Sequence, residues 1–417
     1  MSSTTSIWSR TFAALQVRNF RFYFIGQLIS VSGTWMQSVA QNWLVLQLTG
    51  SASDLGISVA LQFLPMLFFG FYGGLVADRN PKRKILLFTQ LGAGLLALSL
   101  GLLVTTHHVT LTWLFVMSFA LGCVNLFDQP ARQSFVQQMV GKDLITNAVS
   151  LNSVLMNAGR LVGPGIAAVF IAVLGDAMCF YANAVSYLAV IVALLLMNTA
   201  EFLPLATVSR EKGQVRLGLR YVRDTPILRN VIFSVTVVGT LALNFGVTLP
   251  LLARTTFHQH SAAAYGVMMA ALGFGAIIGG LYTAFKAMPT PKMLLILASG
   301  FAVSLSALTF APTLLMAQLL MVPTGGFMIS FMSSSNATLQ MNSSGQMRGR
   351  VMSLYGTAFL GTTPIGAPLV GIVIGLTNPR IGILVGALSA VFTAGWLAVQ
   401  YRRDVQSELD SGTAPAS

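Results

Sequence analysis

The sequence has few charged residues and very little cysteine. Asp, Glu, Lys and Arg make up only 8% of its 417 residues, whereas soluble globular proteins carry about 25%. So few charges cannot solvate the surface of a chain of this length, which excludes an ordinary soluble enzyme. The two cysteines, Cys123 and Cys179, lie inside apolar stretches. A disulfide framework and a cysteine metal cluster are therefore excluded as well.

Catalytic and nucleotide-binding signatures are also missing. The four histidines fall in polar segments between apolar runs, and Asp128 is the single acid deep within one. A membrane-embedded enzyme needs paired catalytic groups or a metal cluster at depth, so we expect neither an enzyme nor a cofactor. The sequence contains no G-x-x-x-x-G-K-[ST] loop. ATP is therefore excluded as the direct energy source.

Long apolar runs dominate what is present. Apolar residues make up 55% of the chain, and its mean hydropathy is +0.75. A transmembrane helix needs about 20 apolar residues. Twelve segments meet this requirement, beginning near residues 20, 55, 85, 111, 147, 177, 229, 264, 293, 314, 351 and 381. The sequence predicts an all-α integral membrane protein with twelve transmembrane helices.

The basic residues give these helices an orientation. With both termini in the cytoplasm, 21 of the 24 Lys and Arg residues fall on the inner side, while Arg254 and Arg380 lie outside and Arg160 lies within a span. This bias is a strong positive-inside signal. The net charge of +13 is spread in short clusters between apolar runs, unlike the basic stripe of a nucleic-acid-binding protein. We expect a lipid bilayer, and no nucleic acid, as the partner.

The two halves of the sequence resemble each other. Gly73-Gly74-Leu75 recurs as Gly279-Gly280-Leu281, and Gln133 recurs at a similar offset as Gln340. A repeated six-span unit returns the chain to its starting side, so both copies face the same way. The predicted organisation is an N-terminal six-helix bundle at 1–198, a cytoplasmic middle loop at 199–228, a C-terminal six-helix bundle at 229–402 and a disordered cytoplasmic tail at 403–417. In the middle loop, the alternation of basic and apolar residues from Arg210 to Arg223 favours an interfacial helix.

The loop after the second span resembles the signature loop of the major facilitator superfamily. Gly74 is followed four residues later by Asp78, and then by a basic cluster that includes Arg79, Lys82 and Arg83. Asn80-Pro81 stands where the family pattern has glycine. The resemblance implies two pseudo-symmetric six-helix bundles that work by alternating access. It also implies that Asp78 faces the N-terminus of the eleventh helix and holds an inner gate shut.

The fifth span carries a second match. Gly159-Arg160-Leu161-Val162-Gly163-Pro164-Gly165 resembles the antiporter motif of the same superfamily, with Ala167 and Ala168 replacing its closing glycine pair. Small residues at this spacing let helices pack closely, and proline permits a bend. Gly159, Gly163 and Pro164 are therefore predicted to form a pivot. Simple helix packing without directional meaning is an equal alternative.

Further short matches resemble a bacterial exporter subfamily that includes the enterobactin exporter and macrolide or drug efflux proteins. They include Gly33-Thr34-Trp35-Met36-Gln37, Asp128-Gln129-Pro130-Ala131-Arg132-Gln133 and Arg348-Gly349-Arg350-Val351. The resemblance implies a secondary transporter in the bacterial inner membrane that exports a siderophore or a drug. Proton antiport by a functional monomer is expected. A lipid or lysolipid flippase on the same fold is the alternative, favoured by lateral openings lined with apolar residues.

Ionisable residues within spans are candidates for coupling. Asp128 is predicted to be the proton-titrating group, held ionised by Arg160 or by Arg132 until it is protonated. The alternative is a static gate salt bridge between Asp128 and Arg132, which lie four residues apart on one helix face. The first span contains no acid, although many drug/proton antiporters of the superfamily have one there.

Two polar stripes are predicted to line the substrate pathway. Their members recur every three or four residues, which places them on one helix face. The stripes are Gln27, Ser30, Thr34, Gln37 and Gln41 in the first span and Thr240 and Asn244 in the seventh. Hydrogen bonding between helices is the alternative explanation of such a stripe.

Overall fold

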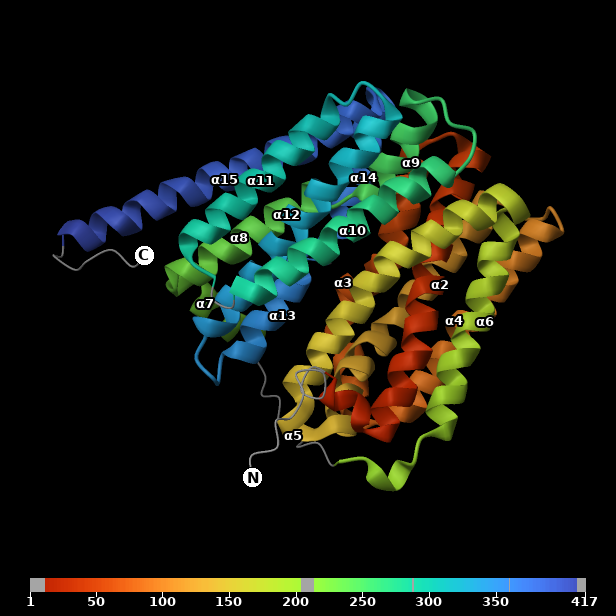
Figure 1. Cartoon of the computed structure of the whole chain (residues 1–417), viewed down its shortest axis with the longest axis horizontal. Coiled ribbons are helices and arrows are strands. Elements are labelled where there is room, and N and C mark those ends of the chain that lie inside the picture. The colour runs from red at the N-terminus through yellow and green to blue at the C-terminus, as the bar shows by residue number, and fades with distance from the viewer. Residues whose placement is uncertain (1–11, 204–213, 287–288, 360, 411–417) are drawn as a thin grey trace, which may run out of the picture. The chain divides into compact units, whose positions relative to one another are not determined.

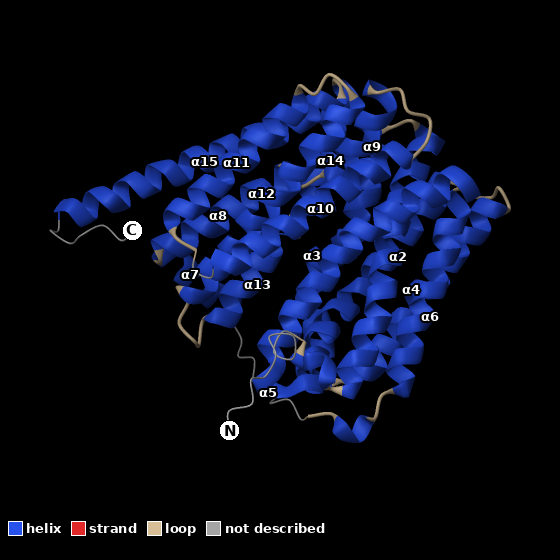
Figure 2. Cartoon of the chain, viewed as in Figure 1, coloured by secondary structure: helices blue, strands red, loops and turns tan. Residues whose placement is uncertain are grey.

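The computed structural model describes residues 12–203, 214–286, 289–359 and 361–410, and every regular element among them is helical (Figure 2). In chain order the first elements are η1 (Ala13–Gln16), α2 (Arg18–Thr49), α3 (Ala52–Arg79), α4 (Lys82–Thr105), α5 (Leu111–Leu174), α6 (Asp176–Leu196), η2 (Thr199–Glu201) and α7 (Gln214–Asp224). They are followed by α8 (Pro226–Leu241), α9 (Phe245–Leu251), η3 (Leu252–Thr256), α10 (Ala263–Lys286), α11 (Pro291–Thr309), α12 (Leu314–Met341), α13 (Arg348–Phe359), α14 (Thr363–Leu376) and α15 (Pro379–Asp410).

The helices account for the twelve predicted spans. Ten helical stretches of the described residues are long and apolar enough to cross a membrane. One of these, α5, is two helices that meet at Gly141, whose φ of 74° lies in the left-handed region that favours glycine. The 32-residue α2 is long enough to cross a membrane, but it is not among these ten stretches, because its polar residues lower its hydropathy. Splitting α5 and adding α2 gives the expected twelve.

The chain divides into two compact units near the predicted boundary. One comprises residues 1–50, 61–209 and 260–270, and the other comprises 51–60, 210–259 and 271–417. The main division, between 209 and 210, falls inside the predicted middle loop. Two short segments were not predicted to fall where they do. Residues 51–60, which include the start of α3, belong to the second unit, and residues 260–270, which include the start of α10, belong to the first.

In the first unit, α2 packs against α5 and α6, and α4 packs against the same two helices (Figure 1). A cluster of aromatic side chains fills one end of this packing. Phe20, Tyr23 and Phe135 are fully buried, and the Tyr23 and Phe135 rings meet edge to face with centroids 6.0 Å apart. This cluster joins the first turns of α2 to the last part of the first helix of α5, close to the polar site described below.

In the second unit, α11 packs against α12 and α15, while α8 contacts α13, α14 and α15. The seventh span is broken, because α8 ends at Leu241 and α9 begins at Phe245. Thr240 donates a hydrogen bond to the Thr236 carbonyl within α8, and Asn244, which lies in the break, donates to the Thr240 carbonyl at the end of α8. Such bonds compete with the helical ladder and bend it. The sequence analysis predicted no break here.

The middle loop and the tail differ from prediction in part. A helix, α7, occupies residues 214–224, whereas Arg210–Gly213 lies outside the described residues. The interfacial position of this helix stays a prediction. The Tyr221 hydroxyl of α7 accepts a hydrogen bond from the Ser344 amide at 3.2 Å, while Leu217 and Leu219 stay exposed. The disordered tail predicted from residue 403 is wrong as far as residue 410, because α15 continues to Asp410. Residues 411–417 lie outside the described part.

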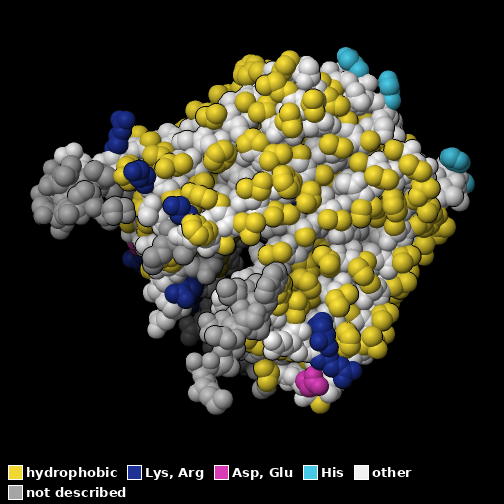
Figure 3. All heavy atoms as spheres, in the orientation of Figure 1, with side chains coloured by type: hydrophobic (Ala, Val, Ile, Leu, Met, Phe, Trp, Pro, Cys, Tyr) yellow, Lys and Arg dark blue, Asp and Glu magenta, His cyan; other side chains and the backbone are white. Residues whose placement is uncertain are grey.

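The visible surface has the character of a membrane protein. Hydrophobic side chains are spread over the face shown in Figure 3, while Lys, Arg and His side chains lie towards its margins. Exposed large apolar residues occur along many of the helices, among them Phe88, Val173 and Phe285. In water, patches of this extent are rare on a monomer. The surface is suited to lipid.

Glycines of the fifth-span motif allow α2 and α5 to pack closely. A Cβ at Gly163 would lie 2.6 Å from the Cβ of Trp35, and one at Gly159 would overlap the side chain of Val31. Gly165 has no such neighbour within 4 Å. The packing interpretation of this motif therefore has a direct geometric basis.

Replacing Gly163 by alanine is expected to destabilise the first unit by about 1–3 kcal/mol, since α2 and α5 must move apart to admit the methyl group. The matched control is Gly165→Ala, two residues away, where the added methyl group meets open space and alanine favours the helix. Thermal unfolding in detergent measures both. Equal melting temperatures for the two variants would contradict the close-packing role.

Candidate functional site

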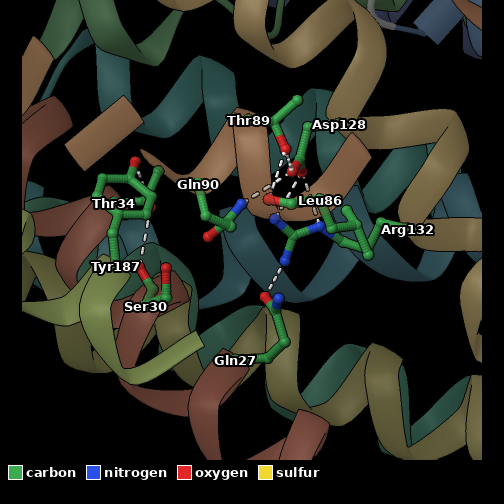
Figure 4. Close-up of polar contacts among 9 residues, drawn as sticks. All are labelled: Gln27, Ser30, Thr34, Leu86, Thr89, Gln90, Asp128, Arg132 and Tyr187. Atoms are coloured by element: carbon green, nitrogen blue, oxygen red, sulfur yellow. Dashed lines mark hydrogen bonds and ion pairs between the residues drawn. The ribbon is translucent and has the colours of Figure 1, made fainter. Parts of the chain in front are cut away.

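The described spans contain one buried charged network, centred on Asp128 of α5 (Figure 4). Asp128 is 4% exposed. Its Oδ1 accepts hydrogen bonds from Thr89 Oγ1 at 2.7 Å and from Gln90 Nε2 at 2.8 Å. Its Oδ2 accepts from both Nε and Nη2 of Arg132, at 2.9 and 2.6 Å. Four donors thus surround a single carboxylate.

The network joins three helices of the first unit. Thr89 and Gln90 come from α4, Asp128 and Arg132 lie one turn apart on α5, and Arg132 Nη1 also donates to Gln27 Oε1 of α2. A carboxylate in lipid is costly unless it is paired and hydrogen-bonded. The network meets this requirement and at the same time holds α2, α4 and α5 in register.

Two polar atoms of the network have no partner. Gln27 Nε2 and Gln90 Oε1 are buried without a hydrogen bond. A buried polar group without a partner is costly, and each of these amides therefore has one hydrogen-bonding position free for a further partner.

The structure distinguishes between the two predicted partners of Asp128. Arg132 forms the ion pair, at 2.6 Å. Arg160 does not reach Asp128; its guanidinium carbon lies 4.9 Å from the ring centroid of Trp35 on α2. The Asp128–Arg160 bridge is therefore absent, and the i, i+4 pair that the sequence analysis left as the alternative is present. Whether Asp128 titrates during transport stays a prediction.

The polar stripe of α2 is mostly covered by neighbouring helices. Gln27, Ser30, Gln37 and Gln41 are buried. Gln37 Oε1 accepts from Asn183 Nδ2 of α6 at 2.7 Å, and Gln41 Nε2 donates to Ser118 of α5 at 2.8 Å. These bonds favour the helix-packing alternative for the stripe. Thr34 differs, because it is exposed while its hydroxyl lies 3.3 Å from that of Tyr187.

In the seventh span the polar side chains bond to backbone carbonyls of the same span. Thr240 is half-buried and Asn244 is buried, and both donate to carbonyls one turn earlier. Gly366 of α14 approaches this break closely enough that a Cβ there would meet the Asn244 amide nitrogen at 3.2 Å. Pathway lining by these residues stays a prediction.

The first turn of α4, directly after the loop from α3, is anchored within the first unit. Arg83 Nε donates to the Leu194 carbonyl at 2.7 Å, and its Nη2 donates to the Leu195 carbonyl at 3.3 Å. These carbonyls belong to the last turn of α6, which has no helical donors left for them. Lys82 donates to the Asp78 carbonyl at 3.1 Å, while Arg79 is exposed. The gate predicted for Gly74 and Asp78 stays a prediction.

Two residues of the site, Thr89 and Gln90, were not predicted. Their contacts are not revealed by local spacing, because their partner lies far away in the chain. Trp35 was predicted only as part of a motif, and its contact with Arg160 was not. A signal did exist on the second helix of α5, where polar residues recur every three or four positions. They are Thr146, Ser150, Ser153, Asn157 and Arg160. In the described part of the chain no group of His, Cys, Asp and Glu could hold a metal.

Comparison with known proteins identifies the family. A model described as "Transmembrane secretion effector" matches residues 9–414. The chain belongs to this family of the major facilitator superfamily. It is 24% identical over 361 residues to the staphyloferrin A transporter of Staphylococcus aureus, covering 84% of this chain and 88% of that protein. It is 24% identical to the enterobactin exporter of Salmonella typhimurium, with 84% of each chain covered. It is 25% identical to the multidrug efflux pump Tap of Mycolicibacterium fortuitum, covering 82% of this chain and 86% of that protein.

Solved structures of transporters share the fold. The nucleoside transporter NupG superposes with a TM-score of 0.69 at 13% identity, covering 93% of this chain and 99% of that one. A bacterial homologue of the human lysosomal transporter Spinster, in an inward-facing and occupied conformation, superposes with a TM-score of 0.69 at 15% identity. The match covers 95% of this chain and 98% of that one. The predicted major facilitator fold is confirmed. This chain is a membrane transporter of small molecules and not an enzyme.

Proposed function

We propose that the protein is a secondary exporter that moves a small amphipathic compound, a siderophore or a drug, out of a bacterial cell by proton-coupled alternating access. The observation that carries the proposal is the family match over nearly the whole chain, together with exporters among its curated relatives. The duplicated six-span halves supply two bundles of the kind that rock about a central site.

Support for proton coupling comes from the Asp128 network. A buried carboxylate within a span is the type of group that proton-driven transporters use. Protonation of Asp128 removes its charge and weakens its two bonds to Arg132, which frees Arg132 and Gln27 to reorganise. Because the network joins α2, α4 and α5, one proton changes the packing of three helices.

We further propose that the protein lies in the bacterial inner membrane with both termini in the cytoplasm and acts as a monomer. The distribution of Lys and Arg supports this orientation. A unit of twelve spans with its own pathway needs no second copy to form a site.

Transport by the purified protein tests the proposal. Proteoliposomes with an acidic lumen are offered a panel of siderophores and amphipathic drugs. At least one compound is expected to accumulate in the lumen through molecules inserted inside out, and a protonophore should abolish the accumulation. If no compound accumulates beyond empty liposomes, or if the protonophore has no effect, proton-coupled export is wrong.

An apolar hollow supports a second candidate, a lipid or lysolipid flippase. It has a volume of about 370 Å³ and lies between α2, α5 and α6. Its lining is apolar apart from two serines, and includes the exposed residues Leu28, Ile29 and Val162. A hollow of this kind suits an acyl chain. Flipping of a fluorescent lysolipid, read by its protection from dithionite in the same proteoliposomes, distinguishes this candidate from export of soluble compounds.

A further inference from the structure

The second helix of α5 has two contrasting faces in its membrane-spanning part. Val162, Ile166, Val169 and Val173 are apolar and exposed. At 100° per residue, the opposite face carries a polar stripe, which we define as Ser150, Ser153, Asn157 and Arg160. Ser150 and Ser153 are exposed, and Asn157 and Arg160 are half-buried. The Ser150 hydroxyl and the Asn157 amide donate to carbonyls one turn earlier, at 2.9 and 3.0 Å, whereas Arg160 carries a charge. Ionisable residues within a span almost always face the bundle interior or a water-filled cavity, which favours a water-facing position for the stripe that ends at Arg160.

Arg160 stands at the deep end of the stripe with no charged partner. Among the described residues, no ion pair involves Arg160, and its Nε is buried without a hydrogen bond. Trp35 lies against its guanidinium, with the ring centroid 4.9 Å from the guanidinium carbon. An aromatic face attracts a cation but supplies no hydrogen-bond acceptor at its edge. The Nε donor of Arg160 therefore lacks the acceptor that a buried N–H group needs.

The acid that could have neutralised Arg160 is already engaged. Asp128 accepts four hydrogen bonds, two of them from Arg132. A cation kept unpaired at depth is costly, and such groups in spans mark ligand paths. The anion that Arg160 lacks must come from outside the chain.

We propose that Arg160, held by Trp35 and approached along the polar stripe of α5, is an anion-binding subsite, and that the transported compound carries a carboxylate or a similarly acidic group on an apolar body. The inference rests on the proposed export function and names its substrate class. A guanidinium binds a carboxylate through two parallel N–H donors. The Trp35 ring fixes the guanidinium plane and offers an apolar surface to the rest of the ligand.

A matched pair of fluorescent probes tests the subsite on the purified full-length protein. Pyrenebutyrate and pyrenebutanol share the aromatic body and the four-carbon arm and differ in the carboxylate, and binding is read by energy transfer from tryptophan. The wild type is expected to prefer the carboxylate by about tenfold or more, because a hydrogen bond to a charged group contributes at least as much free energy as a tenfold change in affinity. Arg160→Gln should bring the ratio of the affinities for pyrenebutyrate and pyrenebutanol close to one without changing the affinity for pyrenebutanol. Arg402→Gln, at the exposed end of α15, is the matched control and should keep the wild-type preference.

A second variant, Asn157→Asp, tests the subsite independently in case Arg160→Gln misfolds. Asn157→Asp leaves Arg160 in place but adds a carboxylate three residues earlier, on the adjacent turn of the same face. It should lower the carboxylate preference as Arg160→Gln does. Equal affinities for the two probes in the wild type, or a preference that survives both variants, would overturn the subsite.

The outcomes for the subsite and for export are separable. Export is read by pH-driven accumulation in proteoliposomes, and the subsite by the ratio of probe affinities. A carboxylate preference without export contradicts the proposed function alone. Export that is unchanged in rate and substrate range in Arg160→Gln, with an unchanged probe ratio, contradicts the subsite alone.

Discussion

Replacing Asp128 by asparagine is expected to abolish substrate-driven proton movement while exchange of substrate across the membrane continues. The change removes the one titratable group of the buried network and keeps its size. Proton movement should fall by about tenfold or more, to the level of empty liposomes, because titratable residues in spans carry the protons of such transporters. A pH-sensitive dye in the lumen measures the flux, and counterflow of labelled substrate measures the exchange.

The surroundings of Asp128 can accommodate an amide. Gln90 has a carbonyl oxygen without a partner, so a flip of its side chain lets it accept a hydrogen bond from the new amide nitrogen. Thr89 also bonds to the Leu86 carbonyl and can turn its hydroxyl accordingly. A folded variant is therefore expected, and a defect in proton movement would report on coupling and not on unfolding.

The matched control is Asp54→Asn, which removes a carboxylate from the first turn of α3. It should keep proton movement, since Asp54 takes no part in the hydrogen bonds of the buried network. If Asp128→Asn still moves protons with substrate, Asp128 serves as a static gate with Arg132. A static gate predicts slower transport at an unchanged ratio of protons to substrate.

How far the site follows from the sequence depends on whether its contacts are local. Asp128 and Arg132 lie one helical turn apart, so their pairing can be predicted from spacing. The structure contains this ion pair. Thr89 and Gln90 reach Asp128 only because α4 packs against α5, and no periodicity encodes that partner. The twelve spans follow from hydropathy. The break at Leu241–Phe245 does not, because apolar residues continue through it.

The α2 stripe shows a second limit of sequence analysis. Spacing of three or four places Gln27, Gln37 and Gln41 on one face, but it does not say what covers that face. The structure covers it with α5 and α6, which supply Ser118 and Asn183 as partners. On α5 the same spacing leads to an exposed face instead. Only tertiary packing separates a polar stripe that joins helices from one that meets water.

Removing Arg132 is expected to be the most destabilising single change in the network. Arg132→Gln leaves the Asp128 carboxylate buried with only Thr89 and Gln90 as donors and deprives Gln27 Oε1 of its partner. Breaking one side of a buried ion pair costs about 3–5 kcal/mol, because the remaining charge is uncompensated. The apparent melting temperature in detergent should fall clearly, while Arg402→Gln should leave it unchanged.

A double mutant separates the value of the pair from the cost of an unpaired charge. In Asp128→Asn/Arg132→Gln both charges are gone, and the two amides can bond to each other and to Gln90. This variant should be more stable than Arg132→Gln alone, with a coupling energy within the range of about 0.5–3 kcal/mol that interacting neighbours show. Simple additivity of the two single changes would mean that Asp128 and Arg132 do not stabilise each other. Recovery in the double mutant, together with loss of proton movement in both variants that lack Asp128, would assign the same ion pair to folding and to coupling.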